Sequence, residues 1–96
     1  MRRRIAWNGV VMVVVDPTGN AQVSGLGLPL DEDYAAFVEE AEGDVARAVT
    51  SLKGAARRDD AAVTEAARLA ARRAAQRWSG KKPQVRVMLV GKARIS

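Results

Sequence analysis

Neither cysteine nor histidine occurs in this chain of 96 residues. Without cysteine there are no disulfides, thiolate zinc sites or cysteine nucleophiles, and without histidine the commonest general base and metal ligand is missing. The four serines therefore have no histidine for a catalytic triad. These absences predict that the chain alone is not an enzyme and holds no metal or cofactor.

Aromatic residues and long apolar runs are also scarce. The only aromatics are Trp7, Tyr34, Phe37 and Trp78, so a core must be built mainly from valine, alanine, leucine and methionine. The longest apolar run, residues 10–15, is far shorter than the about 20 residues that span a bilayer. The start MRRRIAWNGVVMVVV lacks a small-residue cleavage site and is interpreted as a strand rather than a signal peptide. We therefore expect one soluble, cytoplasmic domain over residues 1–96, without membrane contact.

The charges are unevenly distributed along the chain, which carries a net charge of +5. Residues 1–46 contain three arginines against eight acids, whereas residues 47–96 contain thirteen basic residues against three acids. Halves of opposite sign indicate an oriented electrostatic surface. Such a surface fits nucleic acid or an acidic partner, and it fits equally well two halves of the domain that attract each other.

Apolar periodicity and turn residues predict five elements. Residues 3–15 are typical of a β-strand, and the turn DPTGN follows, with Gly19 or Asn20 at positive φ. Residues 21–28 form the return strand of a hairpin. A helix is expected from about Asp31, its candidate cap, to about residue 53, with Gly54 as a stop. The link ARRDD then leads to a second helix.

The second helix and the last strand are marked by their boundaries. Asp59 or Asp60 caps the helix, Gly80 ends it, and residues 84–90 alternate as a strand. The expected fold is α+β, with the order β-β-α-α-β. If the helices pair antiparallel, they cover one face of a three-stranded mixed sheet whose central strand is the first.

This arrangement leaves the other face of the sheet uncovered. The first strand is apolar on both faces, whereas a one-sided sheet normally carries polar residues on its open side. An exposed apolar patch usually marks an interface, which predicts an oligomer or a domain contact. The alternative is a two-sided core position shielded by long arginine side chains. The candidate interface residues are Val10, Met12, Val14, Met88 and Val90.

Other motifs do not support chemistry of their own. The acids of DEDYAAFVEEAEGD lack the turn loop of a calcium site and fit a solvated helix face whose charge matches the helix dipole. SGLGLP lacks the third glycine of a dinucleotide fingerprint, and GKKP lacks the pattern of a phosphate-binding loop.

A basic stripe on the second helix is the candidate for RNA contact. Such a stripe can track phosphates, and its binding weakens with salt. Trp78 lies on the apolar face and is expected in the core, so base stacking is not predicted. The alternative is a solubilising helix face, partly paired with the acids of the first helix. The stripe consists of Arg68, Arg72, Arg73, Arg77, Lys81 and Lys82.

Several stretches resemble the C-terminal domain of bacterial ribonuclease J. RRRIAWNGVVMVVVDPTGN resembles the first strand and turn of that domain, and SGLGLPLDED resembles its second strand and acidic helix opening. RRDDAAVTEAARLAARRAAQRWSGKKPQVRVMLV carries the strongest likeness, with an R-R-D-D start, an arginine-rich helix, a W-x-G-K-K-P hinge and a final V-x-V strand. The likeness covers nearly all of the chain, and it rests on the ordered set rather than on one motif.

The resemblance implies an accessory part of a metallo-β-lactamase/β-CASP ribonuclease that acts in RNA processing and decay. The parent enzyme would be a zinc-dependent endo- and 5′-exoribonuclease, with its H-x-H-x-D-H zinc ligands in a separate catalytic domain. None of those ligands transfers here, because the chain has no histidine. The expected partners are the remainder of the ribonuclease J chain and further copies in a homo-oligomer. RNA is the alternative partner.

Overall fold

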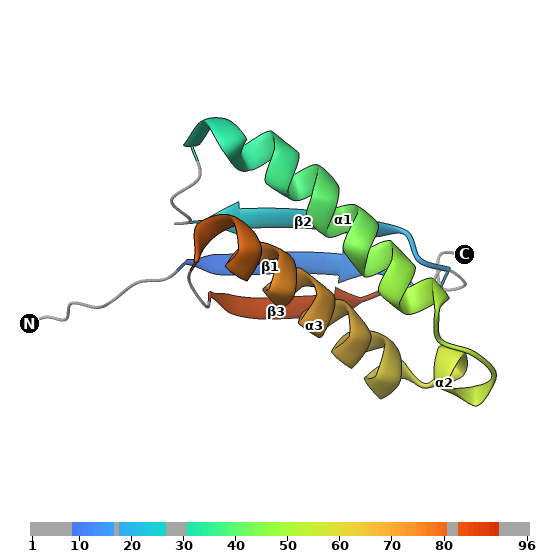
Figure 1. Cartoon of the computed structure of the whole chain (residues 1–96). Helices are drawn as coiled ribbons and strands as arrows, with labels where there is room; N and C mark the ends of the chain where they lie inside the picture. Colours follow the sequence, from blue (N-terminus) through green and yellow to red (C-terminus); the bar gives the residue numbers. More distant parts are fainter. Residues whose placement is uncertain (1–8, 17, 27–30, 81–82, 91–96) are drawn as a thin grey trace, which may run out of the picture.

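A three-stranded mixed sheet forms one layer of the computed structural model (Figure 1). Its strands are β1 (Val10–Val15), β2 (Ala21–Leu26) and β3 (Gln84–Leu89), in the order β2-β1-β3. β1 runs antiparallel to β2 and parallel to β3. The predicted central position of the first strand is therefore confirmed. The structure describes residues 9–16, 18–26, 31–80 and 83–90.

The turn between β1 and β2 is organised by Asp16. Its carboxylate accepts hydrogen bonds from the Thr18 hydroxyl at 2.5 Å and from the Thr18 and Asn20 backbone N–H groups at 2.9 and 3.2 Å. The hydrogen bond from the Thr18 hydroxyl is the main reason that the pKa of Asp16 lies below its usual value. Gly19 has a φ of 100°, which confirms the predicted positive φ at this turn.

The first helix is shorter than predicted at both ends. A 3₁₀ turn over Asp31–Asp33 precedes α1 (Tyr34–Thr50), so the predicted cap Asp31 does not adjoin the α-helix. Ser51 caps its C-terminal end: the Ser51 hydroxyl donates to the Arg47 carbonyl at 2.7 Å. The Arg47 carbonyl also accepts from the Ser51 N–H at 3.0 Å, and the Leu52 N–H then donates to the Val49 carbonyl at 3.1 Å. This tightened last turn ends the helix before the predicted stop at Gly54.

The second half of the chain contains one element that was not predicted. The expected link forms a short helix, α2 (Ala55–Arg58), before α3 (Asp60–Ser79). The Asp59 carboxylate accepts from the Ala61 N–H at 3.0 Å, which confirms Asp59 as a cap of α3. Gly80 ends α3 in the left-handed conformation with a φ of 72°, as predicted.

α1 and α3 pack side by side on the same face of the sheet (Figure 1). Small residues on α3 allow close packing of the helices, and Phe37 is the largest side chain that is fully buried. Trp78, expected in the core, packs against it and is partly buried. The buried core consists of Val11, Val13, Val15, Val23, Phe37, Ala41, Val45, Val49, Val63, Ala67, Ala70, Ala71, Ala74 and Ala75.

Candidate functional site

The face of the sheet opposite the helices carries a row of apolar side chains. On β1, Val11, Val13 and Val15 are buried under the helices, so the alternate residues project from the other face. Met12 is 41% exposed and Met88 is 58% exposed. We call this surface the open face. Four of its members occupy neighbouring register positions on β1 and β3, namely Val10, Met12, Val14 and Met88.

The fifth predicted residue of the open face follows β3 directly. Val90 is 40% exposed, and its N–H donates to the Val15 carbonyl at 2.9 Å. Its position continues the alternation that places Met88 on the open face. All five candidate interface residues therefore share one surface.

Leu26 is a further apolar member of the open face that was not predicted; it is 72% exposed and pairs with Val10. Alternation along the second strand places Leu26 on the same face as Ser24, so the position of Leu26 could have been predicted from the sequence. The open face also has polar members on the two outer strands, namely Gln22, Ser24, Gln84 and Arg86.

Arg68 is engaged along its own helix. Its guanidinium binds the Glu65 carboxylate one turn earlier, with an N–O distance of 2.7 Å. This hydrogen bond raises the pKa of Arg68 and lowers the pKa of Glu65. Both side chains face solvent, so the pair contributes little to stability.

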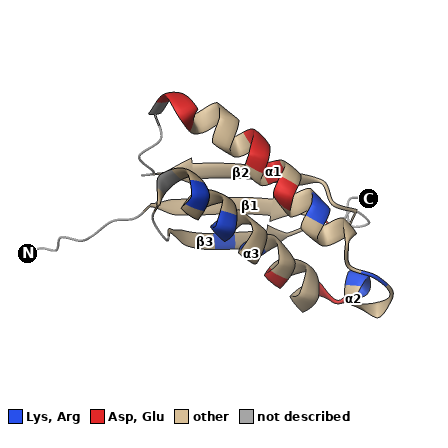
Figure 2. Ribbon diagram, viewed as in Figure 1, with Lys and Arg blue, Asp and Glu red and all other residues tan. Residues whose placement is uncertain are grey.

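Arg77 connects α3 to α1. Its guanidinium lies 2.5 Å from a Glu40 oxygen and 2.6 Å from an Asp44 oxygen. The hydrogen bond to Glu40, followed by that to Asp44, raises the pKa of Arg77. Figure 2 shows the acids along α1 beside the basic residues on the C-terminal half of α3. For Arg77, the stripe is therefore paired with acids of the first helix, as the alternative interpretation of the sequence predicted.

The middle of the basic stripe has no such carboxylate partners. Arg73 is exposed and Arg72 is half-buried, and neither forms an ion pair in the part of the chain that the structure describes. The predicted contacts Lys81 and Lys82 lie outside the described residues. The structure therefore divides the stripe into two arginines that form ion pairs, Arg68 and Arg77, and two that form none with a described residue, Arg72 and Arg73.

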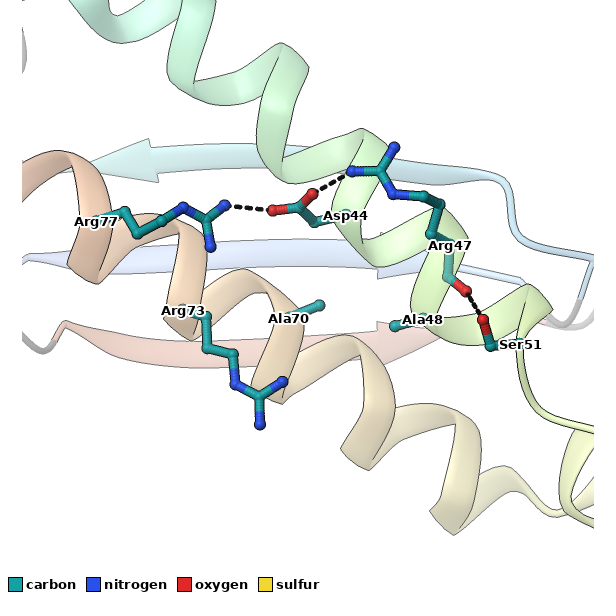
Figure 3. Close-up of a pocket in the computed structure, with 7 residues that line it drawn as sticks. All are labelled: Asp44, Arg47, Ala48, Ser51, Ala70, Arg73 and Arg77. Carbon is teal, nitrogen blue, oxygen red and sulfur yellow. Dashed lines mark hydrogen bonds and ion pairs between the residues drawn. The ribbon is translucent and has the colours of Figure 1, made fainter.

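A groove of about 370 Å³ runs between α1 and α3 (Figure 3). Asp44 accepts from Arg47 and from Arg77 at the same time, which holds two guanidinium groups near one carboxylate. Arg73 adds a third cation to the lining. Because cations outnumber carboxylates here, the groove can attract an anion. Its lining consists of Asp44, Arg47, Ala48, Ser51, Ala70, Arg73 and Arg77.

Metal ligands do not converge in the described parts of the chain. Across residues 9–16, 18–26, 31–80 and 83–90, no three or more histidine, cysteine, aspartate or glutamate side chains form a group that could hold a metal ion. Nor is any helix in these ranges long and apolar enough to cross a membrane.

A model of the ribonuclease J C-terminal domain family matches residues 1–91. The chain belongs to this family. A search of curated proteins finds no match. A ribonuclease J C-terminal domain implies the rest of the ribonuclease J chain as a partner. Zinc ligands of the histidine or cysteine type cannot come from this domain, because its sequence contains neither residue.

Proposed function

We propose that this chain is a non-catalytic accessory domain that supports the oligomer assembly and activity of a zinc-dependent ribonuclease J in RNA processing and decay. The observation that carries the proposal is the open face. A protein that kept Met12, Met88 and Leu26 in water would forgo roughly 25 cal/mol for each Å² of apolar surface that contact could cover. The proposed occupant is the open face of a second copy.

The composition of the open face supports this occupant. Its centre is apolar, whereas glutamine, serine and arginine lie on the two outer strands, as expected for an interface with an apolar centre and a polar rim. Two sheets stack face to face at about 10 Å, so methionine side chains from both copies can interdigitate. Methionine adapts its shape readily to such contacts.

Met12→Glu tests this function. The substitution places a carboxylate at the centre of the open face, where contact would remove it from water, so assembly is expected to weaken by about tenfold or more. Sedimentation velocity over a concentration series measures the change. Ala36→Glu adds the same charge at an exposed position of α1 and should leave assembly unchanged. A wild-type chain that stays monomeric at every concentration would contradict the proposal.

RNA binding is a second candidate function, favoured by the groove in Figure 3. Three guanidinium groups line it, and Arg73 forms no ion pair with any described residue. Guanidinium groups bind phosphate oxygens through paired hydrogen bonds. The groove lies on the helix layer, on the opposite side of the sheet from the open face, so both surfaces can be used together (Figure 1).

A charge reversal at Arg72 and Arg73 distinguishes RNA binding at this part of the helix layer from electrostatic attraction of RNA to the net positive charge of the chain. The variant Arg72→Glu/Arg73→Glu is expected to bind single-stranded RNA about tenfold or more weakly, with a smaller dependence on salt. Fluorescence anisotropy at several salt concentrations measures both quantities. The control reverses Arg57 and Arg58 on α2, which changes the net charge equally. An equal loss in the control would reject the groove as the site.

A further inference from the structure

The two edges of the sheet differ in how their backbone groups are satisfied. On β2, the Val23 N–H points away from β1 and donates to the Glu42 carboxylate at 2.9 Å. Two residues later, the Gly25 N–H donates to the Tyr34 hydroxyl at 2.8 Å. Both acceptors belong to α1. Since unpaired edge groups invite another strand, α1 protects the β2 edge against such pairing.

Among the described residues, no side chain protects the β3 edge in a comparable way. The Gln84 N–H donates to the Gly9 carbonyl at 3.0 Å, and the Val90 N–H donates to the Val15 carbonyl. In a parallel ladder with this register, every second residue of β3 points its backbone groups toward β1, and the residues between them point outward. No hydrogen bond engages these outward groups within the described residues. The outward residues are Val85, Val87 and Leu89.

We propose that the β3 edge pairs antiparallel with the β3 edge of a second copy. The two sheets would then form one six-stranded sheet in the order β2-β1-β3-β3-β1-β2. This contact is additional to the open face, because it uses the backbone at the side of the sheet. An exposed row of backbone N–H and C=O groups binds best to another extended strand, so the expected partner of this edge is a β-strand.

The sequence of β3 is self-complementary in this arrangement. A two-fold axis at Val87 places Val85 opposite Leu89, and Arg86 opposite Met88, of the other copy. The one charged residue of the strand therefore does not face its own copy, as it would if the axis passed through Arg86. Val85, Val87 and Leu89 are only partly buried against the core, so pairing also covers apolar surface.

The protected β2 edge explains why pairing would stop at two copies. A two-fold contact uses the same surface on both chains and is closed. Further growth would need the outer β2 edges, where Glu42 and Tyr34 already occupy outward N–H groups. Edge pairing by itself is therefore expected to give a dimer rather than a fibre.

Single cysteines test the contact cleanly because the chain has no native cysteine. In the proposed pairing, the two copies of residue 88 are diagonal neighbours at about 7–8 Å. Met88→Cys should therefore cross-link with a short bis-maleimide. Leu26→Cys, equally on the open face but on β2, is the control, since the two copies lie about 30 Å apart, five strand spacings across the sheet and six residues along it. Both variants are made in the Met12→Glu background, which disables contact through the open face.

Cross-linking of Met88→Cys with little cross-linking of Leu26→Cys is the expected result. Equal cross-linking of both, or none in either, overturns the edge pairing. A second readout needs no mutation: amide hydrogen exchange at Val85, Val87 and Leu89 should slow as the protein concentration rises. Protection that does not change with concentration also overturns it. The proposed open-face contact is tested separately by sedimentation of Met12→Glu in the native background.

Discussion

Phe37→Ala is expected to lower the free energy of unfolding by about 3–5 kcal/mol, the range for removing a buried phenylalanine. Phe37 is fully buried on α1 and is the largest fully buried side chain described. The other large buried side chains are valines, and α3 contributes mainly alanines. The core therefore has little bulk with which to fill the space that the ring leaves.

The expected loss is a large part of the stability of a small domain. Domains of this size are stable by about 5–15 kcal/mol, so Phe37→Ala should unfold at a much lower urea concentration. Urea denaturation followed by circular dichroism measures the midpoint. Leu26→Ala is the control, because Leu26 is 72% exposed and should cost little. A Phe37→Ala midpoint close to that of the control would contradict the assigned core.

Gly19→Ala is expected to destabilise the chain by about 1–3 kcal/mol through backbone strain, and further through overlap with α1. Gly19 has a φ of 100°, where residues with a side chain are strained. A methyl group at this position would also lie 2.7 Å from the Thr50 Cγ2 atom. The turn between β1 and β2 thus approaches the end of α1 closely enough to require glycine.

Two companion variants separate the strain from the overlap. Gly54→Ala also places a side chain at positive φ, but nothing lies within 4 Å of its added carbon. Thr50→Ser removes Cγ2 and keeps the hydroxyl that donates to the Ala46 carbonyl at 2.9 Å. In thermal unfolding, Gly19→Ala should lower the midpoint temperature more than Gly54→Ala does. Adding Thr50→Ser to Gly19→Ala should restore part of that stability. Equal destabilisation by Gly19→Ala and Gly54→Ala would show that the overlap with Thr50 adds no free-energy cost to the backbone strain.

Much of the fold could be predicted because its signals are local. The continuous apolar run over residues 10–15 indicated one strand with two apolar faces, and burial of Val11, Val13 and Val15 confirms that one face meets the helices. Asp59 and Gly80 acted as predicted at the ends of α3, since capping depends on a few neighbouring residues. The same locality supports the positive φ of Gly19.

Helix boundaries were predicted less well. The residues after α1 were read as helix and then as a link, whereas the structure ends α1 at Thr50 and forms α2 over Ala55–Arg58. The helical periodicity does not change sharply at this point. The last carbonyls of a helix can be satisfied by a tightened turn or by side-chain hydroxyls, so the sequence alone does not fix the terminal residue.

The basic stripe illustrates what periodicity cannot resolve. Arg68, Arg72, Arg73 and Arg77 share a helix and look equivalent in the sequence. Arg77 differs because packing brings Glu40 and Asp44 of α1 beside it. Pairing across 33 or more positions depends on how the two helices cross. The candidate RNA surface could therefore be named from the sequence, but not divided into arginines that form ion pairs and arginines that form none with a described residue.

The sequence by itself determined the family, the order of the three strands and the two long helices, and the existence of an apolar open face, because these follow from residue order and from periodicity of two or about 3.6 residues. Only the tertiary structure decided the state of the sheet edges. Glu42 and Tyr34 protect β2 from positions 19 and 9 residues away, while the outward groups of β3 have no such partner among the described residues. The physical reason is that edge protection depends on where α1 lies over the sheet, and that position is set by core packing between distant segments.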